Sequence, residues 1–351
     1  MRENSTAKPS VWNPGSCSDF SPKEQYQVVD ICKFAFAIFV VMIHVSPFSS
    51  YDSALVGGAG FVLRQAVCRI ADPFYFVAAG FLLFRKIDPK NPDSETVRRY
   101  VFKILRLYGL WSLLLLVGGT GQLWFLGGLA IAVTFLYALL KWRVPFWAIG
   151  AISLAFYLVG AADISFGGGS LVAVLPSAVG KLYGGLNSTV KLAFIMGVPY
   201  VFLGMMFAQK RVVLNKAQAI AGCAVSFALI ICEAIGLHTF GNPTDYYQLV
   251  TLYPFCFFAF YLATHIRLKD KPIYKELRIV GMIVFYSHLL CHRVVVLVCG
   301  ILGKIGGVIG RLASDSLVQF LGTVFFAVAL GVLIARGSQK ERFSFLKYLY
   351  S

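Results

Sequence analysis

The feature that most constrains this chain is the recurrence of apolar segments about twenty residues long from one end to the other. A helix needs about 20 apolar residues to cross a bilayer, whereas the strands of a membrane barrel alternate in short segments. The composition agrees, because 58% of the residues are hydrophobic and 14% are charged, against about 45–50% and about 25% in soluble domains. The sequence therefore predicts an all-α, polytopic integral membrane protein. The ten predicted spans are 28–48, 61–84, 99–117, 123–140, 144–162, 190–208, 217–237, 246–264, 279–302 and 316–335.

The basic residues predict how these spans are oriented. The N-terminal tail and alternating connections hold 24 Lys and Arg residues, whereas the remaining connections hold three, Lys181, Lys304 and Arg311. Basic loops stay on the cytoplasmic side of a membrane, so we expect both termini in the cytoplasm. We predict a cytoplasmic tail at 1–27, a membrane domain at 28–335 and a second cytoplasmic tail at 336–351. This loop bias explains the net charge of +16, and no nucleic-acid partner is predicted.

Neither the cysteines nor the N-terminus suggests further covalent features. None of the eight cysteines forms a C-x-x-C pair, and most lie inside apolar segments, where cysteine acts as a small hydrophobe. We predict neither a disulfide framework nor a metal site. The first 27 residues are polar and no cleavage site follows the first apolar segment, so we expect no signal peptide.

The first span carries two ionisable residues, Lys33 near its start and His44 eleven positions later. A charge at the bilayer centre costs about 2.5–3.5 kcal/mol on insertion scales, so such residues face a partner or a wet cavity. At 1.5 Å per residue, His44 lies about 16 Å beyond Lys33. Arg69 in the second span is expected at a similar depth, paired with Asp72 or Glu233 if its role is structural. Histidine moves protons near neutral pH, so His44 is either a packing residue or a catalytic base.

The connection 85–107 is the most basic, with seven Lys and Arg residues. Part of this charge signals topology, and anionic lipid headgroups would also attract it. Arginine forks suit phosphate oxygens as well, so a phosphate-bearing ligand is the alternative. The candidate contacts, called here the basic quartet, are Arg98, Arg99, Lys103 and Arg106.

Five short motifs follow one another along the chain. Lys33 and His44 form a Lys-x10-His pattern in the first span. The second span contains RIADPFYFVAAGFLL, from Arg69 to Leu83. The other three motifs are KILR from Lys103, LWFL from Leu123 and FYSH ending at His288.

These motifs resemble the acyltransferase 3 family of integral membrane enzymes, which acylate bacterial surface sugars. The first motif of the family is Arg-x10-His, and Lys33 stands at the arginine position. The second is RxxxPFFFxxSGFLL, and Ala79 stands at the usual serine. Gln122 precedes LWFL where the family often has histidine. KILR is similar to the RxxR pair of the family, and FYSH is similar to its IYxxH segment, with one residue fewer in the spacer. The resemblance covers nearly the whole chain, including its length and its ten spans.

The resemblance implies an acyltransferase of the O-acetyltransferase type in the bacterial cytoplasmic (inner) membrane. The enzyme would move an acyl group, by default acetyl, from cytoplasmic acyl-CoA to a hydroxyl of an extracytoplasmic glycan or lipid-linked sugar. It implies His44, Lys33 and Arg69 as catalytic residues. The basic quartet would bind the phosphates of acyl-CoA, and Trp124 would orient the donor or the oxyanion. Acyl-CoA is then a co-substrate, and no bound cofactor or metal is expected.

Two other functions fit parts of this pattern. Ten spans, helices interrupted by Gly and Pro, and intramembrane charges are also typical of a transporter or flippase for an envelope metabolite. Such a transporter should show repeats, and the second half of the chain has no counterpart of the Lys-x10-His pattern or of RIADPFYF. The departures at Lys33, Ala79 and Gln122 also fit a non-catalytic relative. For His288 and His292, polar packing or pore lining is expected rather than catalysis.

Overall fold

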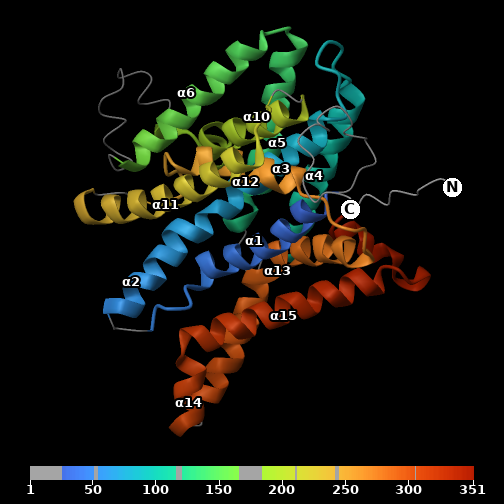
Figure 1. Cartoon of the computed structure of the whole chain (residues 1–351). Coiled ribbons are helices and arrows are strands. Elements are labelled where there is room, and N and C mark those ends of the chain that lie inside the picture. Colours follow the sequence, from blue (N-terminus) through green and yellow to red (C-terminus); the bar gives the residue numbers. More distant parts are fainter. Residues whose placement is uncertain are drawn as a thin grey trace, which may run out of the picture.

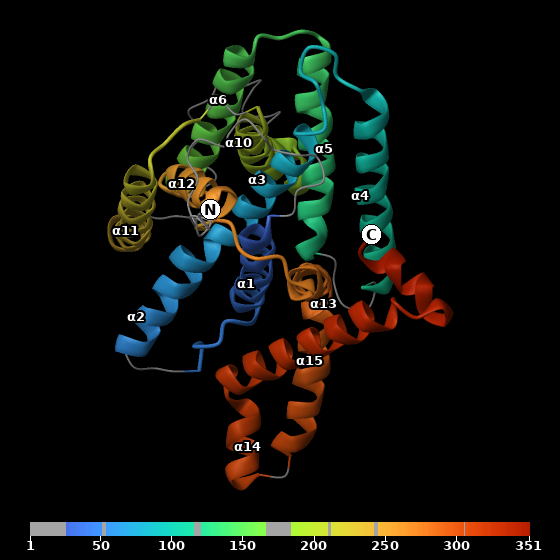
Figure 2. The ribbon, with the colours of Figure 1, turned by 45° about the vertical axis from the view of Figure 1, so that its right-hand side comes forward.

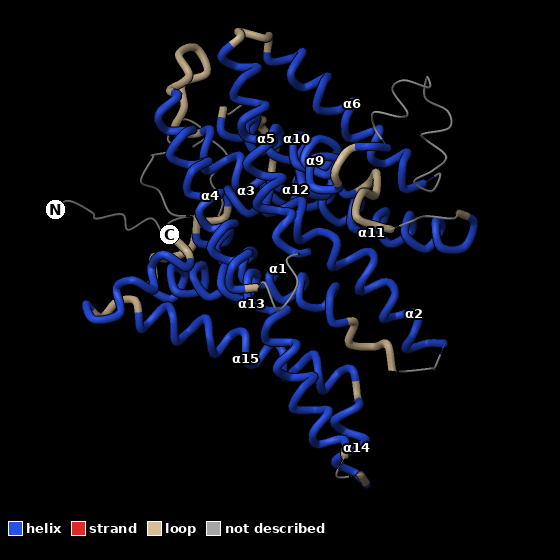
Figure 3. The backbone as a smooth tube through the Cα atoms, turned by 180° about the vertical axis from the view of Figure 1, so that it is seen from behind, coloured by secondary structure: helices blue, strands red, loops and turns tan. Residues whose placement is uncertain are grey.

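A computed structural model of the chain describes residues 26–50, 54–115, 121–165, 184–209, 212–241, 245–304 and 306–351. Within these ranges every regular element is a helix and no strand occurs, as Figure 3 shows. The all-α fold class predicted from the apolar segments is therefore confirmed. The predicted N-terminal tail lies mostly at residues 1–25, outside the described residues.

Each of the ten predicted spans coincides with a helix or with a pair of consecutive helices. These are α1 (Gln27–Val45), α2 and α3 (Ala54–Val62, Ala71–Phe84), α4 (Ser94–Leu114), α5 (Trp124–Lys141), α6 (Phe146–Ser165), α9 and α10 (Ser188–Leu192, Val198–Ala208), α11 (Lys216–Phe240), α12 (Leu252–His265), α13 (Pro272–Gly303) and α15 (Ser316–Gly337). The short α14 (Gly307–Ser314) precedes α15, and a 3-10 helix, Glu341–Leu349, follows it. The joins inside the two pairs are a π-helical turn (Leu63–Val67) with a 3-10 turn (Cys68–Ile70), and a π-helical turn (Ala193–Gly197).

Eight helical segments of the described residues are long and apolar enough to cross a membrane, which makes the chain a multi-pass membrane protein. The predicted count of ten includes two helices that do not meet this measure. Helix α12 has 14 residues, which is about 21 Å of rise against a hydrocarbon core of about 30 Å. Helix α4 carries Glu95 and the whole basic quartet, so one of its faces is strongly charged.

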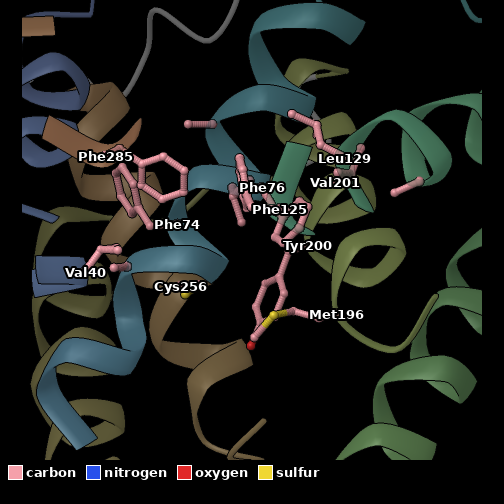
Figure 4. Close-up of a cluster of buried hydrophobic side chains, with 14 of the residues drawn as sticks. Val40, Phe74, Phe76, Phe125, Leu129, Met196, Tyr200, Val201, Cys256 and Phe285 are labelled. Carbon is pink, nitrogen blue, oxygen red and sulfur yellow. The ribbon is translucent and has the colours of Figure 1, made fainter. Parts of the chain in front are cut away.

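Helix α1 lies in the middle of the bundle, as the views in Figures 1 and 2 agree. Helices α13 and α15 lie on one side of it, and α3, α5 and α10 lie on the other. Buried aromatic side chains from α3, α5 and α10 fill the space between these elements (Figure 4). Among them, the rings of Phe76 and Phe125 lie 4.4 Å apart between centroids.

Helices α3 and α10 approach so closely that backbone touches backbone. A Cβ atom built on Gly204 would lie 2.1 Å from the carbonyl oxygen of Val77, and one on Gly80 would lie 2.3 Å from that of Val201. Lipid tails are as apolar as the helices themselves, so the hydrophobic effect does not bring helices together within a membrane. Small residues promote helix association there because they permit such close packing. This contact therefore fixes α3, the helix that contains most of the motif from Arg69 to Leu83.

Helix α4 begins at Ser94 because Asp93 caps it. The Asp93 carboxylate accepts hydrogen bonds from the backbone N–H groups of Glu95 and Thr96, at 2.9 and 3.0 Å. The Thr96 hydroxyl and these two N–H groups hold the pKa of Asp93 below its ordinary value. An ionised cap at this position stabilises the first turn, so most of the basic connection 85–107 is helical.

We predict that Gly204→Ala lowers the thermal unfolding temperature of the purified protein. The added Cβ collides with backbone, which cannot move aside, and overpacking of this kind costs about 1–3 kcal/mol. Gly236→Ala in α11 is the matched control, because a Cβ there meets nothing within 4 Å. Equal unfolding temperatures for the two variants would contradict the close packing of α3 and α10.

The predicted orientation is tested by cysteine labelling in intact cells. Ser49 follows α1 and Lys90 precedes α4, and both are exposed. In a variant without native cysteines, we expect Ser49→Cys to react with a membrane-impermeant maleimide. Lys90→Cys should react only after the membrane is permeabilised. The reverse pattern would place the termini outside the cell.

Candidate functional site

A cavity of about 230 Å³ opens at the Lys33 end of α1. Helices α1, α3, α4, α5 and α13 contribute to its walls, together with Tyr350 near the C-terminus. Most of the lining is aliphatic or aromatic, but three cations reach it, namely Lys33, Lys103 and Arg278. The cavity therefore combines an apolar interior with a positive edge.

Two contacts fix Lys33 and its surroundings. The Tyr75 hydroxyl of α3 donates a hydrogen bond to the backbone carbonyl of Lys33. Helix α13 comes close to α1 at the same level, because a Cβ on Gly281 would lie 3.0 Å from the Cα of Phe34. A residue larger than glycine would push α13, and with it Arg278, away from Lys33.

The basic quartet does not converge on this cavity as a group. Arg98 and Arg99 are exposed, and each forms an ion pair of 2.6 Å with Glu95. Arg106 binds the backbone carbonyl of Ser351 and lies over the ring of Tyr348. Of the four residues, Lys103 alone lines the cavity.

Besides Lys33 and Lys103, the cavity has a third cation, Arg278, which does not belong to the basic quartet. Sequence analysis treated this residue only as part of a basic loop, whereas it lies in the first turns of α13 and lines the cavity. Its face continues through Met282 and Phe285, which line the same cavity. The spacing of i, i+4 and i+7 is the signal that could have revealed this, since such residues share one side of a helix. One carboxylate, Asp30, lies 3.8 Å from Arg278.

The other end of α1 brings two histidines together. His44 lies in the last turn of α1, and its ring centroid is 5.2 Å from that of His288 in α13. His288 is fully buried, whereas His44 is exposed. No spacing in the sequence predicted this pair, because the two residues lie 244 positions apart along the chain.

The hydrogen bonds of His288 define which of its ring nitrogens carries a proton. Its Nδ1 lies 2.8 Å from the carbonyl oxygen of Phe285, an acceptor, so we assign the proton to Nδ1. Its Nε2 has no hydrogen-bond partner among the described residues. With the proton on Nδ1, the Nε2 lone pair of His288 is used by no described residue, and the His288 ring lies 5.2 Å from that of His44.

The cavity and the histidine pair are adjacent along α13. Phe285 and Tyr286 line the cavity, and His288 follows two residues later. Gln122, which stands where the family often has histidine, is buried, and its Nε2 lies 3.4 Å from the carbonyl oxygen of Tyr286. Trp124 does not line the cavity; its ring packs 6.1 Å from that of Phe76.

The predicted partners of Arg69 are wrong. Arg69 forms its ion pair with Asp245 and donates two hydrogen bonds to Gln65, at 2.6 and 3.0 Å. Glu233 instead accepts hydrogen bonds from the backbone N–H groups at 250 and 251, at 2.7 and 2.9 Å, and so caps the start of α12. Asp245 lies in the segment that precedes α12. The sequence did not predict its pairing with Arg69, because Asp72 is far closer to Arg69 along the chain.

Comparison with known proteins gives one domain and two relatives. Residues 26–121 match the family model described as an acyltransferase domain. Two proteins of Enterococcus faecalis, each called amino-acid racemase, are 24% and 26% identical over alignments that cover 89% and 92% of this chain. The chain spans 45% and 48% of the lengths of these two proteins, less than half of each. No solved structure matches.

The matched segment holds most of the residues that the motifs singled out. It runs from the start of α1 to the turn before α5, and it includes Lys33, His44, Arg69 and the basic quartet but not Trp124. The match agrees with the resemblance that these motifs predicted: residues 26–121 of this multi-pass membrane protein match the acyltransferase domain model of the acyltransferase 3 family.

Proposed function

We propose that the protein transfers an acetyl group from cytoplasmic acyl-CoA to a hydroxyl of an extracytoplasmic envelope acceptor, with a glycan or lipid-linked sugar as the acceptor class. The observation that carries this proposal is the pair of unlike sites at the two ends of α1. A cationic, apolar-walled cavity lies at Lys33, and a histidine pair lies at His44. In the predicted orientation, the first faces the cytoplasm and the second faces the outside of the inner membrane.

The cavity suits the chemistry of the donor. Coenzyme A carries phosphates at one end and a long, weakly polar arm that ends in the thioester. Lys33, Lys103 and Arg278 would bind the phosphates, since charge-assisted hydrogen bonds to phosphate are the stronger kind. The exposed Arg98 and Arg99 on α4 extend the same positive surface toward solvent. The aliphatic and aromatic lining would hold the arm, which then reaches toward His288 along α13.

The histidine pair suits the proton transfers of acyl transfer. The acceptor hydroxyl attacks the thioester carbonyl carbon, its proton passes to His44, and the C–S bond breaks. The departing thiolate then takes up that proton as the free thiol. His288 would hold the His44 ring in place and share its proton through Nε2. A transient acyl group on His44 itself is the alternative route.

Arg69 fits a supporting role in this scheme. Its Nε and Nη2 donate to Gln65, and Nη2 also pairs with Asp245, so the guanidinium is held in one orientation. The remaining Nη1 would stabilise the negative charge that develops on the carbonyl oxygen. Removal of one such donor lowers kcat about 10²–10³-fold in known enzymes.

We predict that His44→Gln lowers the transfer of labelled acetyl from acetyl-CoA to envelope acceptors about 10²–10⁴-fold, the contribution of a positioned general base. Label is followed into glycans in membranes that contain the folded protein. His292→Gln is the matched control, because His292 lies one turn after His288 but bonds the Thr323 hydroxyl of α15 at 3.2 Å. It should keep nearly full activity.

Three outcomes separate the alternatives. Label that disappears only in His44→Gln supports the mechanism. Label that survives in His44→Gln would keep the acyltransferase activity but remove the role of His44 as base. Label that never appears with the intact, folded protein would favour a transporter, another donor or a non-catalytic relative.

A second prediction concerns the donor end. Lys103→Gln should raise the KM for acetyl-CoA about tenfold with little change in kcat, because a hydrogen bond to a charged group contributes about 1.5–3 kcal/mol. Lys90→Gln, in the exposed turn before α4, removes the same charge outside the cavity and should leave KM unchanged. Equal KM values in both variants would show that phosphate binding lies elsewhere.

A further inference from the structure

A second cavity, of about 170 Å³, opens at the opposite end of α1 from Lys33. One wall is the end of α1 with the residues that follow it, and the other is the end of α2 with Arg64, which lies in the irregular segment that joins α2 to α3. Its lining includes Met42 and Ser46, which stand two positions before and after His44. A volume of this size holds several waters or a small polar group.

One cation, Arg64, lines this cavity and lacks a carboxylate partner among the described residues. Its guanidinium Nη1 donates a hydrogen bond of 2.6 Å to the Ser46 hydroxyl. Two other cations of the helical bundle are paired with carboxylates: Arg69 with Asp245, and Lys191 with Asp163 at 2.7 Å. Among the described residues this half-buried guanidinium binds a neutral hydroxyl and no carboxylate, so its charge is incompletely compensated there, because buried charges are ordinarily paired.

The backbone around Arg64 departs from α-helical geometry. Arg64 lies inside the π-helical turn Leu63–Val67, which passes directly into the 3-10 turn Cys68–Ile70. Single π-helical turns are rare and frequently lie at functional sites. In a membrane protein, irregular backbone within a span is tolerated where it is buried in protein or lines a cavity. The π-helical turn therefore places Arg64 in the wall of the cavity.

The remaining walls offer aromatic faces and hydroxyls. Phe48 and Phe61 line the cavity, together with Ser46 and Ser49. Phe61 also contacts α11, because its ring centroid lies 4.3 Å from that of His238. Gly60 lets Phe48 come close, since a Cβ there would lie 2.8 Å from the Cβ of Phe48. Flat apolar faces beside hydroxyl groups suit the ring of a sugar.

We propose that this cavity binds the acyl acceptor through an anionic group, a phosphate or a carboxylate, which Arg64 recognises while the acceptor hydroxyl reaches His44. The identification of the bound molecule as the acyl acceptor rests on the proposed function. The inference adds a substrate class, since neutral sugars would lack the group that Arg64 pairs with. An arginine fork binds either oxyanion with two parallel hydrogen bonds.

Ligand binding is measured first, without reference to activity. The thermal unfolding of the purified protein in detergent is followed with glucose 6-phosphate, glucuronate or glucose. A ligand that binds the folded state raises the unfolding temperature in proportion to its affinity. We expect a rise with at least one anionic sugar and none with glucose. If only one of the two raises it, that result assigns the anion as phosphate or carboxylate.

Variants connect the effect to Arg64. In Arg64→Gln the dissociation constant for the anionic sugar should rise at least tenfold, whereas Arg64→Lys should retain part of the affinity. Arg311→Gln is the matched control, because it removes an exposed charge from α14 on the same predicted side of the membrane. Gly60→Val places a larger side chain in the cavity wall, where it collides with Phe48, so it should weaken binding with Arg64 intact. This variant serves if Arg64→Gln does not fold.

Two results would overturn the proposal. One is an unfolding temperature that no anionic sugar raises, or a rise that persists in both Arg64→Gln and Gly60→Val. The other is stabilisation by phosphatidylglycerol nanodiscs alone that depends on Arg64, which would make the residue a lipid anchor. Transfer of labelled acetyl is then compared for the two sugar classes. Arg64-dependent binding without any transfer would keep this cavity as an anion site and reject the proposed function.

Discussion

The backbone contact between α3 and α10 is the interaction on which the remaining geometry depends. Gly80 and Gly204 allow the two helices to touch, and the Tyr75 hydroxyl on α3 then reaches the carbonyl of Lys33 on α1. Gly281 brings α13 against α1 from the other side. Because α1 is held between these neighbours, the cavity at its first turns and the histidines at its last turn keep fixed positions.

A second constraint is the compensation of charge. In water an exposed ion pair contributes about 0–1 kcal/mol, but within a bundle surrounded by lipid an unpaired charge is much more expensive. Asp163 forms an ion pair with Lys191, and Asp245 forms one with Arg69. In the cavity lined by Lys33, Lys103 and Arg278, three cations have one described carboxylate close by, Asp30, which lies 3.8 Å from Arg278, and the proposed anionic donor would neutralise this excess. Charge pairing therefore separates structural cations from those that remain available for binding.

The sequence predicted the helices well because their signal is local. An apolar segment of about twenty residues needs no knowledge of its neighbours, so all ten segments were found as helices, and only the shortness of α12 and the charge on α4 separate them from full spans. Pairings between distant segments could not be predicted in this way. Asp245 lies 176 positions from Arg69, and nothing nearby in the sequence favours it over Asp72. The meeting of His44 with His288 likewise depends on how α13 packs against α1.

Helix α13 runs without a break from Pro272 to Gly303, and it carries both Arg278, which lines the cationic cavity, and His288, whose ring lies beside that of His44. Ten residues separate Arg278 from His288, which is about 15 Å of helical rise. Their spacing does not change when neighbouring helices shift, because a continuous helix is far stiffer than the contacts around it. In the proposed reaction, this fixed spacing would set the distance between the phosphates of the donor and the thioester that reaches the histidines. Selection among acyl carriers would then be a matter of length before it is one of chemistry.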